Sequence, residues 1–165
     1  MSDLLTKRLV LHPLTVAESQ RLVSGEPDGV DRWAPGYPTP GDVIAATRFL
    51  GTCANTDAPQ GAPFCNYEIR RREDGHAIGG IGFHGLPDES GGVTIGFGLS
   101  PAVRGQGYAS EALRALLQFA REHGVTRVKG DTDHDNAASQ HVLTAAGMHP
   151  TLQDERLRSF EITWA

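Results

Sequence analysis

The sequence predicts a mixed α/β fold, and three observations lead to this prediction. Three strand-like runs follow one another in the middle of the chain, separated by the turn-forming residues 73–75 and 88–92. The hydrophobic period then changes from two residues to 3.6, as it does where a helix follows a strand. The chain has 165 residues, so folding buries roughly 70% of the extended chain's surface, enough for one core. We therefore expect a single domain over residues 1–165.

The first part of the chain predicts one strand, a helix and a long loop. Residues 8–12 form the expected strand, which Pro13 stops. Thr15 and Glu18 have the spacing of a capping box, in which both side chains satisfy early backbone donors, so a helix begins there. Several glycines and prolines in residues 25–40 predict a loop after that helix.

The second helix begins with Thr39 as its N-cap and Pro40 at its first helical position, where proline fits well. A mobile loop over residues 55–63 is expected to end it. The later elements comprise strands over residues 66–72, 77–84, 93–99, 127–132 and 156–164, a helix with the apolar stripe Ala112, Leu113, Leu116, Leu117 and Ala120, and a helix over 137–146. The strand before the striped helix and the strand after it form a crossover, so they are expected to be parallel.

Composition and charge exclude several classes of protein. Fifteen Lys and Arg residues against 20 Asp and Glu give a formal net charge of -5, which disfavours broad binding to nucleic acid or to a membrane surface. No apolar run approaches the ~20 residues that cross a bilayer, and no signal peptide is visible. Cys53 and Cys65 have no CxxC spacing, so we expect reduced thiols in a cytoplasmic protein. The acidic run at 131–135, with His141 nearby, lacks the glycine and glutamate of a calcium loop, so no metal is expected.

The segment with the clearest chemistry lies between the strand that ends at Leu99 and the following helix. Its loop reads Arg104-Gly105-Gln106-Gly107. The start of a helix carries unpaired N–H groups and a partial positive charge, which suit phosphate oxygens. Glycines let the backbone approach a ligand closely, and an arginine adds a cation of fixed geometry. The P-loop and dinucleotide-binding patterns are both absent, so neither of those classes of phosphate loop applies.

The run Arg104-Gly105-Gln106-Gly107-Tyr108-Ala109 fits the pattern R/Q-x-x-G-x-G/A. Here the sequence resembles the GNAT superfamily of acyl-CoA N-acetyltransferases, and within it the ribosomal-protein-alanine N-acetyltransferase (RimJ/RimL-like) branch. Further segments match in the same order. They are residues 6–14, similar to that branch's opening strand, 78–83, similar to its central strand, and 136–148, similar to its N-x-x-S motif with the following Leu and Gly.

The resemblance implies a GNAT-like sheet that is mostly antiparallel, with one splayed parallel pair and flanking helices. It also implies acetyl-CoA as co-substrate and no metal. The residues implied to bind acetyl-CoA are Leu99, Arg104, Gly105, Gln106, Gly107, Tyr108, Ala109, Asn136 and Ser139. Of these, the loop would hold the pyrophosphate, while Leu99 and Asn136 would contact the pantetheine arm. Ser139 would also donate a proton to the departing thiolate, although serine and asparagine at a helix start often only cap it.

The sequence departs from the family at two positions that bear on catalysis. Leu143 stands where many members have a tyrosine acid, and Thr94 stands near the place of a glutamate base. Attack by an amine still needs a proton acceptor. His84, at the end of its strand, has a suitable pKa and is the first candidate base. Glu68 is the second candidate.

The function expected from these residues is transfer of an acetyl group from acetyl-CoA directly to a primary amine. The amine belongs to a peptide N-terminus or to a small molecule. A non-catalytic acyl-CoA-binding or sensor protein is the alternative, and an unrelated phosphate-binding module is a third. Contacts to the acceptor are expected around Trp33 and Tyr37 and in the turn over residues 85–92. By analogy with the family, a homodimer is also considered.

Overall fold

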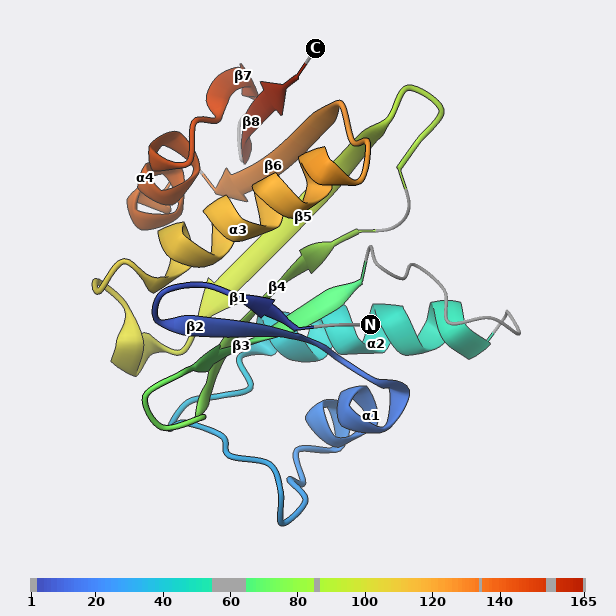
Figure 1. The fold of residues 1–165 in the computed structure, drawn as a ribbon, viewed down its shortest axis with the longest axis vertical. Helices are drawn as coiled ribbons and strands as arrows, with labels where there is room; N and C mark the ends of the chain where they lie inside the picture. The colour runs from blue at the N-terminus through green and yellow to red at the C-terminus, as the bar shows by residue number, and fades with distance from the viewer. Residues whose placement is uncertain (1–2, 55–64, 85–86, 134, 154–156, 165) are drawn as a thin grey trace.

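The computed structural model describes residues 3–54, 65–84, 87–133, 135–153 and 157–164. Eight strands form one sheet in the order β1-β2-β3-β4-β5-β6-β8-β7 (Figure 1). The strands are β1 Leu4–Leu5, β2 Leu9–Pro13, β3 Asn66–Arg71, β4 Ala77–Phe83, β5 Gly92–Leu99, β6 Arg127–Asp133, β7 His149–Gln153 and β8 Leu157–Thr163. The helices are α1 Val16–Ser24, α2 Pro40–Ala54, α3 Tyr108–Glu122 and α4 Ala137–Ala145, with a short 3-10 turn at Pro101–Val103.

Neighbouring strands are antiparallel except for β5 and β6, which are parallel. Parallel pairing covers only Gly92–Ile95 against Arg127–Gly130. Both strands continue beyond it, β5 to Leu99 and β6 to Asp133. The two strands therefore separate toward their carboxyl ends, which confirms the expected splayed pair and opens a slot in the sheet.

The two faces of the sheet carry different helices. Tyr67, Ile81 and Phe97 align across β3, β4 and β5, and their face packs against α3, which crosses in front of β5 and β6 (Figure 1). The stripe of α3 that includes Leu113 and Leu116 is fully buried there. Burial of such apolar side chains contributes about 1.5–3 kcal/mol each. This large cluster is the main core.

The opposite face, which is called the α2 face below, is covered by α1 and α2. A smaller cluster of buried residues lies on this side. It consists of Leu14, Leu22, Tyr37, Ala46 and Ala77, with Trp33 packed against them. The two clusters lie on either side of one sheet, as layered α/β folds require.

The helix boundaries follow the local sequence signals. Thr15 and Glu18 form both bonds of the predicted capping box. Thr39 Oγ1 accepts a hydrogen bond from Asp42 N at 3.3 Å, and Asp42 Oδ2 accepts one from Thr39 N at 2.9 Å, so Thr39 caps α2 as predicted. Gly124 follows α3 with φ at +84°, a backbone conformation that favours glycine. No helix in the described part of the chain is long and apolar enough to cross a bilayer.

Two strands were not predicted. β1 has only two residues, too few for an alternating pattern to stand out. β7 contains Pro150, which argues against a strand, but β7 is an edge strand and its pairing with β8 is irregular after Pro150. An edge tolerates proline because one row of its backbone groups faces away from the sheet. The predicted loop over 55–63 lies outside the described residues.

Candidate active site

The loop between β5 and α3 leaves the first turn of α3 without a side-chain cap. Gly105 and Gly107 both have φ at +82°. Gly107 is the N-cap of α3, and within the described residues no side chain caps the N–H groups of the first turn. These donors and the partial positive charge of the helix start are therefore available to an anion.

Arg8, at the start of β2, holds this loop in place. Its guanidinium lies 4.5 Å from the centre of the Tyr108 ring. Its Nη1 donates to Gln106 O at 2.9 Å, and its Nε donates to Glu111 Oε1 at 2.7 Å. Arg104 turns back along the strand, because its Nε donates to Leu99 O at 3.2 Å. Arg8 is thus a second cation at the loop, which the sequence analysis did not assign to the site.

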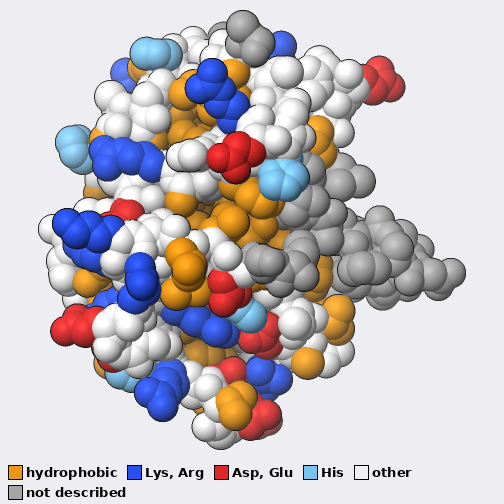
Figure 2. All heavy atoms as spheres, in the orientation of Figure 1, with side chains coloured by type: hydrophobic (Ala, Val, Ile, Leu, Met, Phe, Trp, Pro, Cys, Tyr) orange, Lys and Arg blue, Asp and Glu red, His pale blue; other side chains and the backbone are white. Residues whose placement is uncertain are grey.

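A cavity of about 630 Å³ lies between this loop and the start of α4. It is lined by Phe97–Leu99, Arg104, Gly105, Gly107–Ser110, Asn136–Ser139, His141 and Val142. All but Gln106 of the residues predicted to bind acetyl-CoA meet here. Figure 2 shows Lys and Arg side chains gathered on the left of the molecule, the side on which Figure 1 shows the β5–α3 turn. The cavity, the uncapped helix start and these cations fit a large, phosphate-bearing ligand.

Asn136 and Ser139 both lie at this cavity. Asn136 Oδ1 accepts a hydrogen bond from Ser139 N at 3.0 Å, so Asn136 caps α4. Its amide nitrogen is not used in the cap. The Ser139 hydroxyl is not used either, because only the backbone of Ser139 bonds to Asn136.

The slot between β5 and β6 exposes backbone groups of β5. His84 N donates to Thr94 O at 2.8 Å, and Ser100 N donates to Ile78 O at 2.8 Å. The backbone groups of even-numbered residues in this part of β5 therefore bond to β4. Because backbone groups point to alternate sides along a strand, the N–H and C=O of Phe97 and Leu99 point toward the slot. Beyond Ile95, β6 no longer pairs with that edge.

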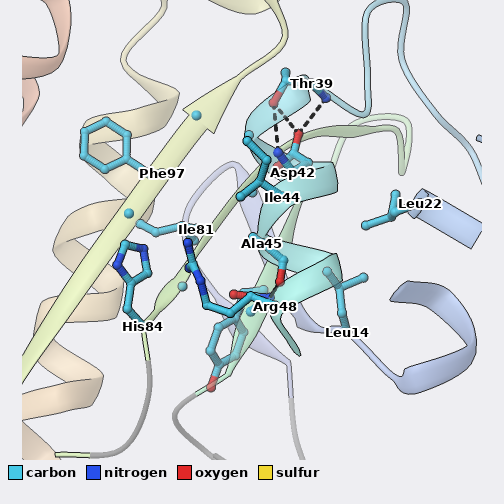
Figure 3. Close-up of a pocket in the computed structure, with 17 residues that line it drawn as sticks. Leu14, Leu22, Thr39, Asp42, Ile44, Ala45, Arg48, Ile81, His84 and Phe97 are labelled. Atoms are coloured by element: carbon cyan, nitrogen blue, oxygen red, sulfur yellow. Dashed lines mark hydrogen bonds between the residues drawn. The ribbon is translucent and has the colours of Figure 1, made fainter. Parts of the chain in front are cut away.

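A second cavity, of about 260 Å³, lies on the α2 face and is shown in Figure 3. Four glycines form its floor. Gly80 of β4 aligns with Gly98 of β5, and Gly82 aligns with Gly96. A side chain at Gly98 would meet no atom within 4 Å, whereas one at Gly80 would lie 2.3 Å from Asp42 Oδ1. The cavity exists because these positions carry no side chains beneath α2.

Apolar residues from both layers make up much of the wall, and a few polar groups converge on it. In Figure 3, His84 and Phe97 lie beside β5, while Asp42, Ala45 and Arg48 lie on α2. Phe97 lines both this cavity and the larger one, and Gly98 does too. A third cavity of about 130 Å³ includes His84 and Ser139. All three cavities thus meet at Phe97, beside the slot.

His84 lies where a proton acceptor would be needed. Its Nε2 would be 2.7 Å from a Cβ at Gly96, so the ring rests directly on the glycine floor. Partial desolvation and the positive charge of Arg48 lower the pKa of His84, while the charge of Asp131 opposes them. The imidazole is therefore mostly neutral at pH 7 and able to accept a proton. Its ring remains accessible to solvent.

Glu68, the second candidate base, is engaged elsewhere. Its Oε2 accepts from Tyr37 Oη at 2.9 Å, and its Oε1 accepts from Arg70 Nε at 2.7 Å. It is buried and does not line any of the three cavities. Tyr37 and Trp33 pack in the smaller core cluster, and neither of these residues expected to contact the acceptor lines the α2-face cavity. Of the turn over 85–92, residues 85 and 86 lie outside the described residues, and residues 87–92 line none of the three cavities.

The other positions discussed for chemistry have ordinary surroundings. Leu143 is 1% exposed and belongs to the main core. Cys65 is a buried free thiol, and burial raises its pKa to about 11. Among the described residues, no group of three or more His, Cys, Asp and Glu side chains is placed to hold a metal ion.

Sequence reasoning missed the glycine floor, Asp42 and Arg48. A signal for the floor was present, because Gly80-Ile81-Gly82 and Gly96-Phe97-Gly98 repeat one pattern on two neighbouring strands. With a period of two, such glycines share a face of the sheet. Asp42 lies in the first turn of α2, where the sequence analysis considered only Thr39 and Pro40.

Comparison with known proteins agrees with this geometry. Residues 8–149 match the model of the acetyltransferase (GNAT) domain. The chain belongs to the GNAT acetyltransferase family. The GNAT chain is 35% identical over 85 residues to YjdG, an uncharacterized N-acetyltransferase of Bacillus subtilis, a match that spans 51% of each protein. It thus spans about half the length of that curated relative.

Solved structures share the fold across almost the whole chain. RimL, a ribosomal-protein alpha-N-acetyltransferase solved with coenzyme A, superimposes with a TM-score of 0.72 at 16% identity and 98% coverage of both chains. A GNAT-family acetyltransferase of Bacillus anthracis superimposes with a TM-score of 0.70, also at 16% identity and 98% coverage of both. These likenesses confirm the mixed sheet with its one parallel pair. Coenzyme A, in its acetylated form, is the family's co-substrate.

Proposed function

We propose that this GNAT protein transfers an acetyl group from acetyl-CoA to a primary amine, without a covalent enzyme intermediate. The observation that carries the proposal is that the cavity at the β5–α3 loop and the α2-face cavity share Phe97, which lies on β5 where β6 no longer pairs with it. One cavity suits a nucleotide-bearing donor, and the other suits an acceptor. The slot is where a thioester and an amine would meet.

Binding of acetyl-CoA is assigned to the predicted residues. The uncapped first turn of α3, with Gly105 and Gly107, would hold the pyrophosphate, and Arg104 and Arg8 would add positive charge. The slot-facing N–H of Leu99, whose C=O already accepts from Arg104 Nε, would pair with the pantetheine arm. The Asn136 amide nitrogen, which its capping bond does not use, would contact the same arm.

The chemistry is assigned to three groups around the slot. His84 would accept the proton of the attacking amine, directly or through one water. The N–H of Phe97 would donate to the oxygen that gains charge during attack. The Ser139 hydroxyl would supply a proton to the departing thiolate. Such positioned donors and acceptors each contribute on the order of 10²–10⁴-fold to a rate.

The proposed acceptor is the one that the sequence predicts, which is the amine of a peptide N-terminus or of a small molecule. Resemblance to the ribosomal-protein acetyltransferase branch, together with the structural likeness to RimL, supports the first. The small volume of the α2-face cavity, about 260 Å³, supports an acceptor of which only a compact part enters.

Calorimetric titration with acetyl-CoA tests the first half of the proposal. We expect saturable binding of one acetyl-CoA per chain, and a missing signal at millimolar ligand would contradict it. Thiol release in the presence of a panel of primary amines tests the second half. Binding without amine-dependent release would instead support the non-catalytic acyl-CoA sensor.

A further inference from the structure

Asp42 presents an unused carboxylate oxygen to the α2-face cavity. Its Oδ2 accepts from Thr39 N at 2.9 Å and from Thr39 Oγ1 at 2.8 Å. Its Oδ1 lies over Gly80, and no described residue donates to it. Asp42 is only partly buried and lines the cavity, so this oxygen is available to a ligand there. Capping α2 uses only half of the carboxylate.

The surroundings of Asp42 favour a positively charged partner. Burial and the nearby charge of Glu68 raise the pKa of Asp42, although its bonds from Thr39 oppose this rise. A cation against Oδ1 would relieve both unfavourable effects. Arg70, which pairs with Glu68, is not among the residues that line the cavity.

The opposite end of the cavity has the opposite charge. The Arg48 side chain reaches toward His84 in Figure 3, and its charge lowers the pKa of that histidine. An amine beside His84 is therefore favoured in its neutral, nucleophilic form. A charged group of the same molecule is favoured at the Asp42 end.

The separation of the two ends sets the size of such a molecule. Asp42 Oδ1 lies over Gly80, which is aligned with Gly98 of β5, next to the slot. Neighbouring strands are about 4.8 Å apart, so the carboxylate lies roughly one to two strand spacings from the slot. A chain of about four carbons spans such a distance.

We propose that Asp42 binds a second positively charged or N–H-bearing group of the acceptor. The inference rests on the proposed acetyl transfer and names its acceptor class, compact molecules with two nitrogen groups. In the reaction, the C–N bond to the acetyl carbon forms and the C–S bond breaks. His84 takes the amine proton, and the thiolate is protonated to free coenzyme A. Asp42 takes part in neither proton transfer, because it holds the other end of the acceptor.

The test uses the 165-residue chain and acetyl-CoA with three small amines of equal chain length as acceptors. The probes are 1,4-diaminobutane, butylamine and 4-aminobutyrate, and the readout is thiol release. We expect kcat/KM for the diamine to exceed that for butylamine by roughly tenfold or more, the size of one hydrogen bond to a charged group. The aminocarboxylate should be the poorest substrate because its carboxylate meets Asp42.

Asp42→Asn removes the charge, while the new amide oxygen still accepts from Thr39. We expect this variant to lose the diamine preference and to bind acetyl-CoA as the wild type does. Asp88→Asn is the matched control. Asp88 also accepts backbone N–H groups in a turn, from Ser90 and Gly92, but lies outside all three cavities. It should leave the preference unchanged.

Equal rates for diamine and monoamine, or a preference for 4-aminobutyrate, would overturn the inference while leaving acetyl transfer intact. Loss of the diamine preference in both variants would overturn it too, because net charge alone would then explain the effect. Absence of acetyl-CoA binding, or of release with any amine, would contradict the proposed function itself. The two failures are therefore distinguishable.

Discussion

His84 is a neutral imidazole because its neighbours make the charged form unfavourable. Partial desolvation and Arg48 lower its pKa, against the opposing charge of Asp131. Replacing His84 by Gln should reduce kcat by about 10²-fold or more, with acetyl-CoA affinity unchanged. The wild-type rate should fall as the pH drops through the histidine pKa, below about 6.5. Steady-state kinetics across pH 5–9 measure both effects.

Arg48→Gln tests whether His84 is the group that titrates in that experiment. Without the guanidinium charge, the His84 pKa rises, so the acidic limb of the rate profile should move to higher pH. A limb that stays in place would mean that another group titrates. A His84→Gln variant that keeps the wild-type rate would remove His84 from the mechanism.

The two roles considered for Ser139, in the helix cap and in proton transfer, use different groups of the residue. The bond to Asn136 uses the backbone N–H of Ser139 and not its hydroxyl. Ser139→Ala should therefore leave the melting temperature within about 2 °C, the change expected for a substitution within 0.5 kcal/mol. If the hydroxyl protonates the thiolate, kcat should fall by roughly tenfold or more. An unchanged kcat would leave Ser139 a helix-start residue only.

At the scale of elements, Glu111 clamps α3 to the start of the chain. Its carboxylate accepts from Thr6 Oγ1, from Arg8 N at 2.8 Å and from Arg8 Nε at 2.7 Å. Burial raises the pKa of Glu111, but these donors outweigh it and the pKa lies below its ordinary value. Because the folded pKa is lowered, the clamp stabilises the fold above the unfolded pKa. That contribution is lost as pH falls through the folded pKa.

Glu111→Gln should lower the free energy of unfolding by about 1 kcal/mol at pH 7. The value is small because Arg8 is half-exposed, so that solvent screens its ion pair with Glu111. The difference from wild type should shrink as the pH falls below about 4. Urea denaturation at both pH values measures it. Glu122→Gln, at the exposed end of the same helix, is the matched control. A deficit that persists unchanged in acid would show that lost packing, and not charge, causes it.

Element-scale prediction from sequence succeeded where a strong local signal existed and failed where tertiary context decided. The capping box of Thr15 and Glu18 and the stripe of α3 are local, and the structure has both. β7 forms despite Pro150 because it lies at a sheet edge, a fact that no local window contains. The loop to which acetyl-CoA binding is assigned could be singled out for a similar reason, because its residues are contiguous in the chain. The α2-face cavity was not, because its floor and its wall come from segments far apart.

At the scale of the whole molecule, the slot divides the sheet into two parts. Strands β1 to β5 lie on one side of it, and β6, β8 and β7 on the other. Direct pairing between these parts covers only four residues of each strand, Gly92–Ile95 and Arg127–Gly130. A ligand that fills the slot would contact both parts, from Leu99 on β5 to Asn136 and Ser139 on α4. Its binding energy would then add to the stability of the whole fold.

We therefore expect acetyl-CoA to raise the melting temperature. A ligand at 100 times its Kd stabilises the folded state by about 2.7 kcal/mol, and for a chain of this size that is roughly 5–10 °C. Gly107→Val should abolish the shift, because its Cβ would lie 3.3 Å from Arg8 Nη2 and its side chain would enter the phosphate-binding loop. Thermal denaturation with and without ligand measures the change.

A matched control separates loss of binding from backbone strain. Gly124 has φ at +84°, close to the +82° of Gly107, and no atom lies within 4 Å of a Cβ built there. Valine at either position adopts a conformation that costs about 1–3 kcal/mol, so both variants should melt below wild type in the absence of ligand. Only Gly124→Val should then recover the full increase on adding acetyl-CoA. If Gly107→Val recovers it as well, the phosphate groups are held elsewhere, and the assignment of the β5–α3 loop fails.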